Sequence, residues 1–303
     1  MYDIIIVGAG PAGLTASIYA RRADKKVLVL EANSYGGQII SASDVENYPG
    51  ERHISGFDFA TKLYNQAKDL GSEIVFEKVI DIKDDKEKEV VTTNNTYKAK
   101  AVILATGSFN RKLGIDKEEE FIGKGVSYCA TCDGAFFKNK DVAVVGGGNT
   151  ALEDALYLSD IVKKVYIIHR RDSFRGDEKT LKELKSKDNV IFVYNSNVTR
   201  LIGNEKLEGI EVKDNYGKVA IIDVDGIFIA IGRIPENRNF SKLIKLDELG
   251  YAISGEDCHT NVDGVFVAGD NRTKSLRQLV TATSDGGISA TEAIKYINSI
   301  KNN

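Results

Sequence analysis

Short apolar runs that end in glycine alternate with amphipathic segments along the chain. The first run, residues 4–7, is followed by a glycine-rich turn and by residues 11–22, whose apolar positions recur with the helical period. A second apolar run, VLVLE, ends at Glu31. A continuous apolar run bounded by turn residues is typical of a strand that is buried on both faces of a parallel sheet. The pattern therefore predicts a strand, a tight turn, a helix and a second, parallel strand.

The same plan recurs between residues 140 and 171. The corresponding positions of the two copies are Gly8 and Gly146, Gly10 and Gly148, Gly13 and Ala151, and Glu31 and His169. Each copy continues with short strand-like runs and closes with a buried strand that ends in glycine, at Gly107 and at Gly232. The sequence therefore predicts an α/β protein with two related, Rossmann-like domains of three layers, each a parallel sheet with a small antiparallel insertion.

Too little chain follows Gly232 for a third domain of this kind. The remaining segment contains one more apolar strand, which leads to Asp270, and a helix expected from about Arg277. The economical arrangement returns this segment to the first domain. We therefore expect a discontinuous first domain, residues 1–113 and 241–303, with the second domain, residues 114–240, inserted into it. Within the first domain, the strand-like run of residues 96–100 is expected to lead to the buried strand of residues 101–107.

Composition narrows the class of protein. The 303 residues are 42% hydrophobic, enough for a sizeable core, and carry a net charge of −3. This charge offers no excess of cations for a nucleic acid or an anionic lipid surface, so neither is expected as a partner. The apolar start has no basic flank, as a secretory signal would, and no apolar stretch approaches the roughly 18 residues of a membrane-spanning helix. With so few cysteines, the chain is expected in the reducing cytoplasm.

The first glycine turn has the spacing of a dinucleotide site. Gly8 permits a tight turn, Gly10 lets the backbone approach a pyrophosphate, and Gly13 allows close contact between helix and strand. Pro11 falls in the first helical turn, where its missing N–H group is no loss. The other N–H groups of the helix start attract phosphate. Glu31 stands where an acid accepts hydrogen bonds from ribose hydroxyls, so the sequence predicts a dinucleotide site near the N-terminus.

The second turn differs at the ribose position. His169, Arg170 and Arg171 stand there instead of an acid, and Arg175 follows. An acid would repel a 2′-phosphate, whereas arginine binds phosphate through paired hydrogen bonds. A solvated basic loop is the alternative interpretation. Because the repeat places the cluster at the ribose position, we expect NADP rather than NAD in the second domain.

Cys129 and Cys132 form a CxxC pair that Asp133 follows at once. A separation of three can place both side chains on one side of a helical turn, within reach of a disulfide. In a reducing compartment such a pair favours redox or metal chemistry over a structural role. A helix start would lower a thiol pKa and so favour the attacking thiolate. Asp133 is placed to transfer the proton that each exchange step requires, and capping the turn is its alternative role.

A zinc site is disfavoured, because a closed site needs four ligands. Beyond the pair, the chain offers only Cys258 and the histidines His53, His169 and His259, none of which forms a second pair with ligand spacing. No metal is expected. Cys258, in a polar turn, is expected to be an inert thiol, and His259 to lie on the surface.

Six motifs, taken in order, resemble those of the low-molecular-weight bacterial thioredoxin reductases across nearly the whole chain. They are GAGPAG, GGQI with VENYPG, CATCDG, GGGNTA, HRRDSFR and GVFVAGDNRTKSLRQLVTATSDG. CATCDG immediately before the second nucleotide turn and the RQL of the last motif are together highly specific to this family. Larger disulfide reductases carry their redox cysteines in the first domain and match less well. The resemblance implies FAD in the first domain, NADPH in the inserted domain, thioredoxin as the protein substrate, and a homodimer.

The resemblance also implies which residues contact FAD. They are Gly8, Gly10, Pro11, Ala12, Gly13, Glu31, Gly37, Gln38, Asn47, Ala105, Thr106, Gly107, Gly269, Asp270, Arg277, Gln278 and Leu279. Gln38 and Asn47 would lie along the flavin, and Asp270 would hold the ribityl or phosphate region. The helix that opens at Arg277 would place its positive end near a reduced flavin. A turn residue at Asn47 and a helix cap at Asp270 are the simpler alternatives.

For NADPH the resemblance implies Gly146, Gly148, Asn149, Thr150, Ala151, His169, Arg170, Arg171 and Arg175. Two residues depart from the family pattern: Asn149, where an acid is frequent, and Gly176, where alanine is frequent. In the implied reaction, electrons pass from NADPH through FAD to the Cys129–Cys132 disulfide, and the dithiol reduces thioredoxin by exchange. The inserted domain is expected to rotate about its two connections, so that the flavin meets the nicotinamide and the disulfide in turn.

Three other functions stay open: a reductase of the same fold that takes electrons from ferredoxin, a flavin-dependent dithiol oxidase, and a non-enzymatic flavin or nucleotide sensor. The first two are expected to lack the NADPH arginines, and a sensor would not need CATCD. The intact GGGNTA and HRRDSFR motifs therefore favour the NADPH-dependent reaction.

Overall fold

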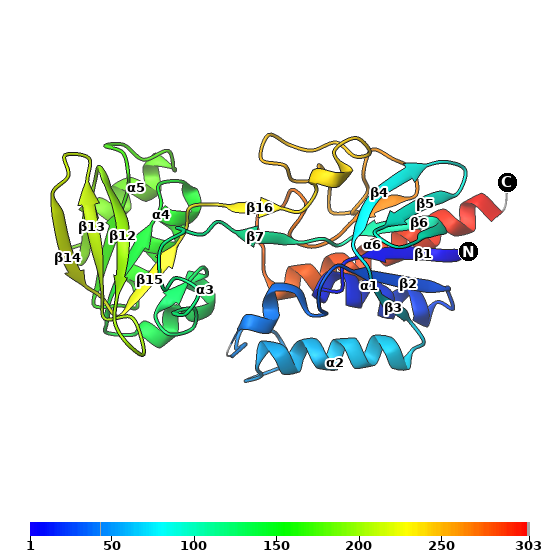
Figure 1. Cartoon of the computed structure of the whole chain (residues 1–303), viewed down its shortest axis with the longest axis horizontal. Helices are drawn as coiled ribbons and strands as arrows, with labels where there is room; N and C mark the ends of the chain where they lie inside the picture. Colours follow the sequence, from blue (N-terminus) through cyan, green and yellow to red (C-terminus); the bar gives the residue numbers. More distant parts are fainter. Residues whose placement is uncertain (43, 302–303) are drawn as a thin grey trace. The chain divides into compact units, whose positions relative to one another are not determined.

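The computed structural model describes residues 1–42 and 44–301 and divides the chain into two compact units (Figure 1). Unit 1 consists of Met1–Phe109 and Ile234–Asn303, and unit 2 of Asn110–Arg233. Residues 43, 302 and 303, which belong to the first domain expected from the sequence, lie outside the described part.

The two connections between the units are β7 (Ser108–Asn110) and β16 (Arg233–Pro235), which pair with each other. The observed boundary, between Arg233 and Ile234 within β16, precedes the expected boundary at residue 240 for a physical reason. The side chain of Asn237 is fully buried and donates hydrogen bonds to the carbonyls of Gly250, at 3.0 Å, and Asn271, at 2.6 Å. The chain is therefore already part of unit 1 at this point.

Unit 1 is built on a sheet whose parallel part contains the first dinucleotide motif. In spatial order its strands are β3 (Glu73–Phe76), β2 (Val27–Glu31), β1 (Tyr2–Val7), β6 (Thr96–Leu104), β5 (Lys88–Thr92) and β4 (Val79–Asp84), with β17 (Val265–Val267) also paired to β6. The pairs among β1, β2, β3, β6 and β17 are parallel, whereas β4 and β5 form the antiparallel insertion. Ile4, Ile5 and Ile6 of the central strand are fully buried, which stabilises the fold by roughly 1.5–3 kcal/mol each.

Strand β6 joins the two strand-like segments expected here, because residues 96–100 and 101–104 form one continuous strand. Its N-terminal part pairs antiparallel with β5, and its C-terminal part pairs parallel with β17, while β1 pairs along most of its length. One long strand therefore carries both the insertion and the parallel sheet, and no turn is needed between them.

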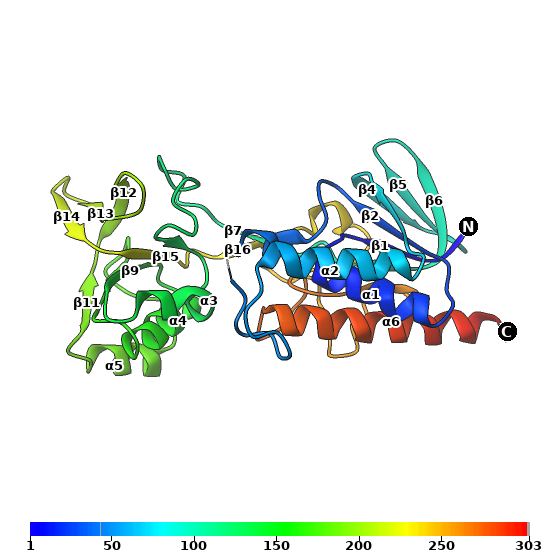
Figure 2. The same cartoon turned by 90° about the horizontal axis from the view of Figure 1, so that it is seen from below.

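The helices of unit 1 are α1 (Pro11–Arg22), α2 (Gly56–Asp69) and α6 (Leu279–Lys301), with the 3₁₀ turns η1 (Gly37–Ser41) and η3 (Arg238–Phe240). Alternate side chains of a strand point to opposite faces of a sheet. Ile4 and Ile6 accordingly pack against α1 and α6 on one face, where Figure 2 shows α1, α2 and α6 side by side. Ile5 and Val7 pack against the antiparallel insertion and residues 240–252 on the other face.

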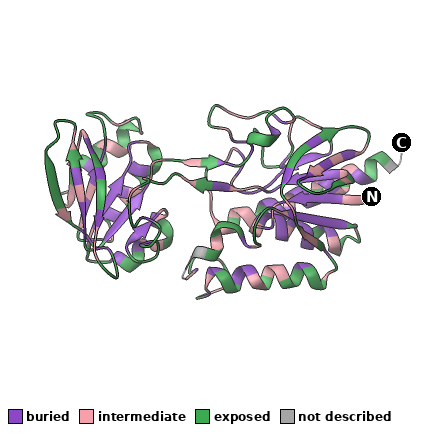
Figure 3. Ribbon diagram, in the orientation of Figure 1, coloured by how far each residue is buried: buried purple, intermediate pink, exposed green. Residues whose placement is uncertain are grey.

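Unit 2 repeats this plan on a smaller scale. Its elements are the parallel sheet β11 (Val190–Val193), β10 (Lys164–Ile168), β9 (Asp141–Val145), β15 (Gly226–Ile229) and β8 (Val126–Ser127), the antiparallel sheet β12 (Ser196–Ile202), β13 (Gly209–Asp214) and β14 (Val219–Asp223), and the helices α3 (Ala130–Asp133), α4 (Asn149–Ser159), α5 (Glu178–Lys185) and η2 (Gly134–Phe137). Val142 and Val144 face α4, whereas Ala143 and Val145 face the antiparallel sheet. Figure 3 shows the buried strands of the parallel sheet within these layers.

The predicted α/β fold of two related three-layer domains, the second inserted into the first, is confirmed. No helix in the described part of the chain is both long enough and apolar enough to cross a membrane.

Candidate functional site

The glycine turn between β1 and α1 leaves an open cradle at the start of the helix. Gly8 has a φ angle of +110°, and a Cβ atom there would lie 2.3 Å from the carbonyl oxygen of Ala105. A Cβ atom on Gly13 would lie 1.9 Å from the oxygen of Gly8, so the helix packs directly on the turn. At Gly10 the nearest atom to a Cβ would be the Cα of Gly37, at 3.9 Å, and no side chain caps α1. Open space beside uncapped N–H groups fits a pyrophosphate.

Glu31 ends β2, and its carboxylate folds back onto this turn. Oε2 accepts a hydrogen bond from the N–H group of Ala9 at 2.8 Å, and Oε1 accepts one from Asn33 at 2.9 Å. These bonds fix the carboxylate next to the cradle. Because each carboxylate oxygen has further lone pairs, ribose hydroxyls can still donate to it.

Segments that are distant in sequence meet around the cradle. The N–H group of Gly36 donates to the carbonyl of Ala9 at 2.8 Å, which places the turn at residues 37–38 beside it. Gly269 follows β17 with a φ angle of +91°, and a Cβ atom there would lie 3.0 Å from the Cβ of Ala12. The start of α1, residues 37–38 and residues 269–270 therefore line one region of unit 1, as expected for a shared ligand.

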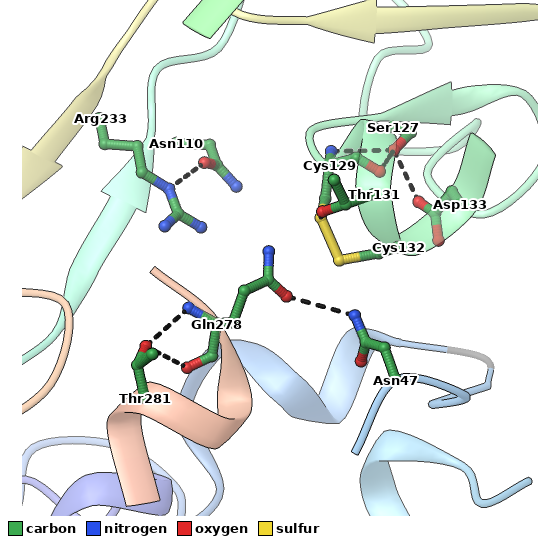
Figure 4. Close-up of a disulfide and its surroundings, with 10 residues drawn as sticks. All are labelled: Asn47, Asn110, Ser127, Cys129, Thr131, Cys132, Asp133, Arg233, Gln278 and Thr281. Carbon is green, nitrogen blue, oxygen red and sulfur yellow. Dashed lines mark hydrogen bonds between the residues drawn. A yellow bond between two sulfur atoms is a disulfide. The ribbon is translucent and has the colours of Figure 1, made fainter. Parts of the chain in front are cut away.

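Asn47 and Gln278 are joined directly, although they are far apart in sequence. The amide Nδ2 of Asn47 donates to Oε1 of Gln278 at 3.3 Å (Figure 4). Arg277 places its guanidinium 4.0 Å from the ring centre of Tyr251, and its Nε donates to the carbonyl of Asp270 at 3.4 Å. Leu279 then begins α6, two residues later than the helix expected from Arg277. Asn47, which lies in a bend of the chain, is therefore joined to the residue that precedes α6.

The end of β6 is held by a buried amide that the sequence analysis missed. Nδ2 of Asn271 donates to Oγ1 of Thr106 at 2.9 Å and to the carbonyl of Leu104 at 3.1 Å. Asn271 and Asn237 are both fully buried. They fix residues 105–107 at the carboxyl end of the sheet, where ligands of parallel α/β folds bind. The one feature of the sequence that could have pointed to Asn271 is its position directly after Asp270.

The turn between β9 and α4 in unit 2 has the same form. A Cβ atom on Gly146 would lie 2.4 Å from the carbonyl oxygen of Ala230, whereas one on Gly148 would meet no atom within 4 Å. Ala151 is buried against the turn, and Thr150 is exposed on the first turn of α4. The open position again lies at an uncapped helix start, so this turn also fits a dinucleotide.

The expected basic cluster separates into a buried ring and exposed cations. His169 is 6% exposed, its Nε2 lies 3.0 Å from the carbonyl oxygen of Ser173, and its ring stacks on Phe174 with 4.8 Å between centres. Burial lowers the pKa of His169, and the neighbouring arginines lower it further. Its imidazole is therefore neutral and packs beneath the turn. The exposed members of the cluster are Arg170, Arg171 and Arg175.

Both departures from the family pattern have a structural role in this loop. Oδ1 of Asn149 accepts a hydrogen bond from the N–H group of Asp177 at 2.8 Å. The N–H group of Arg175 donates to the carbonyl oxygen of Gly147, also at 2.8 Å. A Cβ atom on Gly176 would lie 2.5 Å from Cδ1 of Leu152. Glycine therefore lets the loop that carries Arg175 dock against the glycine turn.

Cys129 and Cys132 are joined by a disulfide, with 5.3 Å between their Cα atoms (Figure 4). Cys129 precedes the short helix α3 and is half-buried, while Cys132 lies within that helix and is exposed. The spacing therefore brings the two sulfur atoms together on one helical turn, as expected. Thiol–disulfide exchange requires that a partner thiolate reach one of the two sulfur atoms, and Cys132 is the exposed residue of the pair.

Asp133 lies beside this disulfide in a partly buried position. Burial raises the pKa of its carboxyl, and a hydrogen bond from the hydroxyl of Ser127 to Oδ2, at 2.6 Å, partly opposes this. The same hydroxyl oxygen accepts a hydrogen bond from the N–H group of Cys129 at 3.0 Å. Ser127 thus links the first cysteine to the acid. No motif in the sequence pointed to Ser127, although it stands two residues before Cys129.

Cys258 lies in the expected turn, where its N–H group donates to the carbonyl of Gly255 at 3.2 Å, and its side chain is fully buried. Burial raises the pKa of its thiol to about 12, with Asp285 adding to the effect, so the thiol stays protonated and unreactive. His259 is exposed as expected and lies 3.3 Å from a carboxylate oxygen of Glu292. His53 is also exposed, and its Nδ1 lies 2.9 Å from Oδ2 of Asp44.

Three comparisons with known proteins agree with this geometry. A family model described as pyridine nucleotide-disulphide oxidoreductase matches residues 2–286. The thioredoxin reductase of Listeria monocytogenes is 44% identical to this chain, and the match covers 99% of this chain and 95% of that protein. The thioredoxin reductase of Bacillus subtilis is 41% identical, and the match covers 99% of this chain and 96% of that protein. A crystal structure of thioredoxin reductase from Streptococcus pyogenes matches with a TM-score of 0.94 at 39% identity, covering 99% of both chains.

Proposed function

The chain belongs to the pyridine nucleotide-disulphide oxidoreductase family, and from this premise we propose that it is an NADPH-dependent flavoprotein that reduces the disulfide of thioredoxin. The observation that carries the proposal is the Cys129–Cys132 disulfide, which lies beside the partly buried carboxyl of Asp133. The names of the curated relatives support thioredoxin as the protein substrate.

The two open glycine turns support the assignment of the cofactors. Unit 1 would hold FAD at the start of α1, with Glu31 at the ribose and residues 269–270 and 277–279 along the rest of the molecule. Unit 2 would hold NADPH at the start of α4, with the exposed Arg170, Arg171 and Arg175 at the 2′-phosphate. When bound, NADPH supplies a hydride, and FAD passes the two electrons on to a disulfide.

The chain's own residues carry out the thiol chemistry. Reduction of the Cys129–Cys132 bond requires two electrons and two protons, and leaves two thiols. Because burial raises its pKa, Asp133 holds a proton more tightly than an exposed aspartate would, and it can transfer that proton to or from a neighbouring sulfur. A thiolate of the pair then attacks the thioredoxin disulfide and forms a mixed disulfide. The second cysteine resolves it, which restores Cys129–Cys132 and releases reduced thioredoxin.

The proposal includes a rotation of unit 2 about β7 and β16, which would bring the nicotinamide and the disulfide to the flavin in turn. Unit 2 contains both the CxxC pair and the second nucleotide turn, whereas the first nucleotide turn belongs to unit 1. A homodimer and a cytoplasmic location stay predictions from the sequence.

The test is anaerobic oxidation of NADPH or NADH by the purified, flavin-loaded protein, with thioredoxin as the acceptor. We expect fast turnover with NADPH and little with NADH. Cys132→Ser should still bind flavin and still be bleached by NADPH, but should reduce thioredoxin at least 1,000-fold more slowly, because no internal disulfide can form. Cys258→Ser, which alters the buried free thiol, is the matched control and should keep full turnover.

Two outcomes would contradict the proposal. Thioredoxin reduction by Cys132→Ser at the wild-type rate would show that the pair is not the electron carrier. A flavin-loaded wild type that oxidises neither nicotinamide would instead favour the ferredoxin-dependent reductase or the dithiol oxidase, and oxygen uptake with a dithiol substrate would identify the oxidase.

A further inference from the structure

A buried cluster of charges lies beside the loop that carries Asp270. The side chains of Arg272, Lys274 and Asp285 are 2%, 5% and 4% exposed. Nε and Nη2 of Arg272 donate to the two carboxylate oxygens of Asp285, both at 2.8 Å, and Nζ of Lys274 donates to Oδ2 at 2.8 Å. Burying three charges costs more than burying apolar side chains of similar volume. We therefore interpret the cluster as a device that fixes the position of neighbouring backbone, and not as one that raises the free energy of unfolding.

The cluster holds the segment from residue 269 to residue 274 against α6. The N–H group of Gly269 donates to Oδ2 of Asp285 at 2.9 Å. Nη1 of Arg272 donates to the carbonyls of Thr273, at 3.0 Å, and Gly255, at 3.2 Å. The Asp285 carboxylate thus accepts hydrogen bonds from the backbone on one side of Asp270 and from two side chains on the other, which fixes the peptide that precedes Asp270.

Gly286, which follows Asp285 in α6, sets how closely this helix packs against the start of α1. A Cβ atom on Gly286 would lie 2.3 Å from the carbonyl oxygen of Ala12, so α6 touches the first turn of α1 at this point. Gly269 also approaches Ala12, with 3.0 Å between a Cβ placed on Gly269 and the Cβ of Ala12. Asp285 and Gly286 therefore set the distance between the helix start and the loop of residues 269–274.

We propose that Asp285 is a positioning residue for the flavin cofactor: its carboxylate, held by Arg272 and Lys274, fixes Gly269 and Asp270 at the correct distance from the start of α1. The inference rests on the proposed function, because it assumes that FAD occupies this cradle. Asp285 acts through Gly269 and Asp270 and need not touch the cofactor itself.

The test compares FAD binding with stability in the full-length protein. FAD affinity is measured by fluorescence titration of the deflavinated chain, and stability by urea unfolding. Asp285→Asn keeps the size of the side chain but removes the charge. R272M/K274M/D285L replaces the three charged side chains with apolar side chains of similar volume. This variant keeps the interior filled but has no carboxylate to accept the hydrogen bond from the N–H group of Gly269. Glu292→Gln removes a carboxylate from the same helix and is the control.

We expect wild type and Glu292→Gln to bind FAD equally well. Asp285→Asn and the triple variant should bind FAD at least tenfold more weakly, although the triple variant should unfold at a urea concentration no lower than wild type. A purely structural role predicts the same stability for the triple variant but a different FAD affinity, namely one equal to that of wild type.

The two proposals fail in different ways. A wild type that binds no FAD would overturn the proposed function together with this inference. A wild type that binds FAD, with either folded variant lacking the Asp285 carboxylate binding it equally tightly, would overturn this inference alone.

Discussion

Asp133, Asp154 and Asp285 are partly or fully buried aspartates whose surroundings move their pKa values in different directions. Burial raises the pKa of Asp133 and Asp154. It also opposes ionisation of Asp285, but the hydrogen bonds from Arg272 and Lys274 outweigh it, and the pKa of Asp285 is lowered. The residue type alone therefore does not determine the charge. Hydrogen-bond donors that stabilise the ionised carboxylate decide in which direction burial finally moves its pKa.

Asp154 leads to a prediction about pH. Burial on α4 and the nearby Glu153 raise its pKa to about 7, while Arg233 partly opposes them. An acid whose pKa is raised by folding binds its proton more tightly in the folded state, so its contribution to stability declines as pH rises from about 4 to about 7. Asp154→Asn should therefore match wild type near pH 4 and exceed its free energy of unfolding by about 2–4 kcal/mol above pH 7.

Urea unfolding of wild type and Asp154→Asn from pH 4 to pH 8 measures this difference. Glu183→Gln, which removes an exposed carboxylate of α5, serves as the control and should change stability much less. A difference between Asp154→Asn and wild type that stays constant over this range would contradict the predicted titration.

The exposed arginines after β10 lead to a prediction about coenzyme choice. Joint replacement of Arg170 and Arg171 by alanine should raise the KM for NADPH at least 20-fold, because charged hydrogen bonds to phosphate contribute about 1.5–3 kcal/mol each. The KM for NADH, which has no 2′-phosphate, should change less than about threefold. Lys163→Ala is the control, since Lys163 is exposed near the opposite end of the same strand. Equal losses for both coenzymes would mean that the arginines do not bind the 2′-phosphate.

At the scale of elements, the contact between α1 and α6 depends on the absence of two side chains. Gly286 lies against the backbone of α1, where a Cβ atom would come within 2.3 Å of the carbonyl oxygen of Ala12. At Gly287 a Cβ would lie 3.2 Å from Cζ of Tyr19, a side chain that is 51% exposed and can move. The two adjacent glycines therefore differ in what they tolerate.

We predict opposite results for alanine at these two positions. Gly286→Ala must push the helices apart, which should destabilise the protein by roughly 2–4 kcal/mol, as other overpacked or strained sites do. Gly287→Ala should be neutral, or stabilising by up to about 1 kcal/mol, because alanine favours a helix over glycine. Thermal unfolding of both variants measures this. Similar melting temperatures for the two would contradict the close contact at Gly286.

At the scale of the whole molecule, the chain consists of two units with separate cores. The apolar clusters of unit 1 surround β1 and β6, whereas those of unit 2 surround β9 and β15. Only β7 and β16 connect the two units along the chain. This organisation predicts that each unit unfolds as its own cooperative element.

Ligands should therefore stabilise one unit at a time. In calorimetry, FAD at about 100 times its Kd should stabilise unit 1 by about 2.7 kcal/mol and shift its unfolding transition upward by several degrees. Adenosine 2′,5′-bisphosphate, which carries the 2′-phosphate of NADPH, should shift only the transition of unit 2. A single transition that both ligands shift would show that the units unfold together.

The repeated strand, glycine turn and helix of this chain are determined by local sequence. Gly8, Gly13 and Gly146 occupy positions where a Cβ atom would collide with backbone, so the motif itself specifies the turn. The pairing of Cys129 with Cys132 is likewise local, because one helical turn brings them together. These features could be predicted because residues that are neighbours in sequence decide them.

Only the tertiary structure decided the charge state and place of residues whose partners are distant in sequence. The repeat places His169 in the expected phosphate-site cluster, and only the fold shows that its ring is buried against Phe174 and that burial lowers its pKa. Asp285 escaped notice, because its partners Arg272 and Lys274 become neighbours only when α6 packs against the loop after β17. Burial and hydrogen bonding depend on what the rest of the chain places around a group, and no local pattern records that.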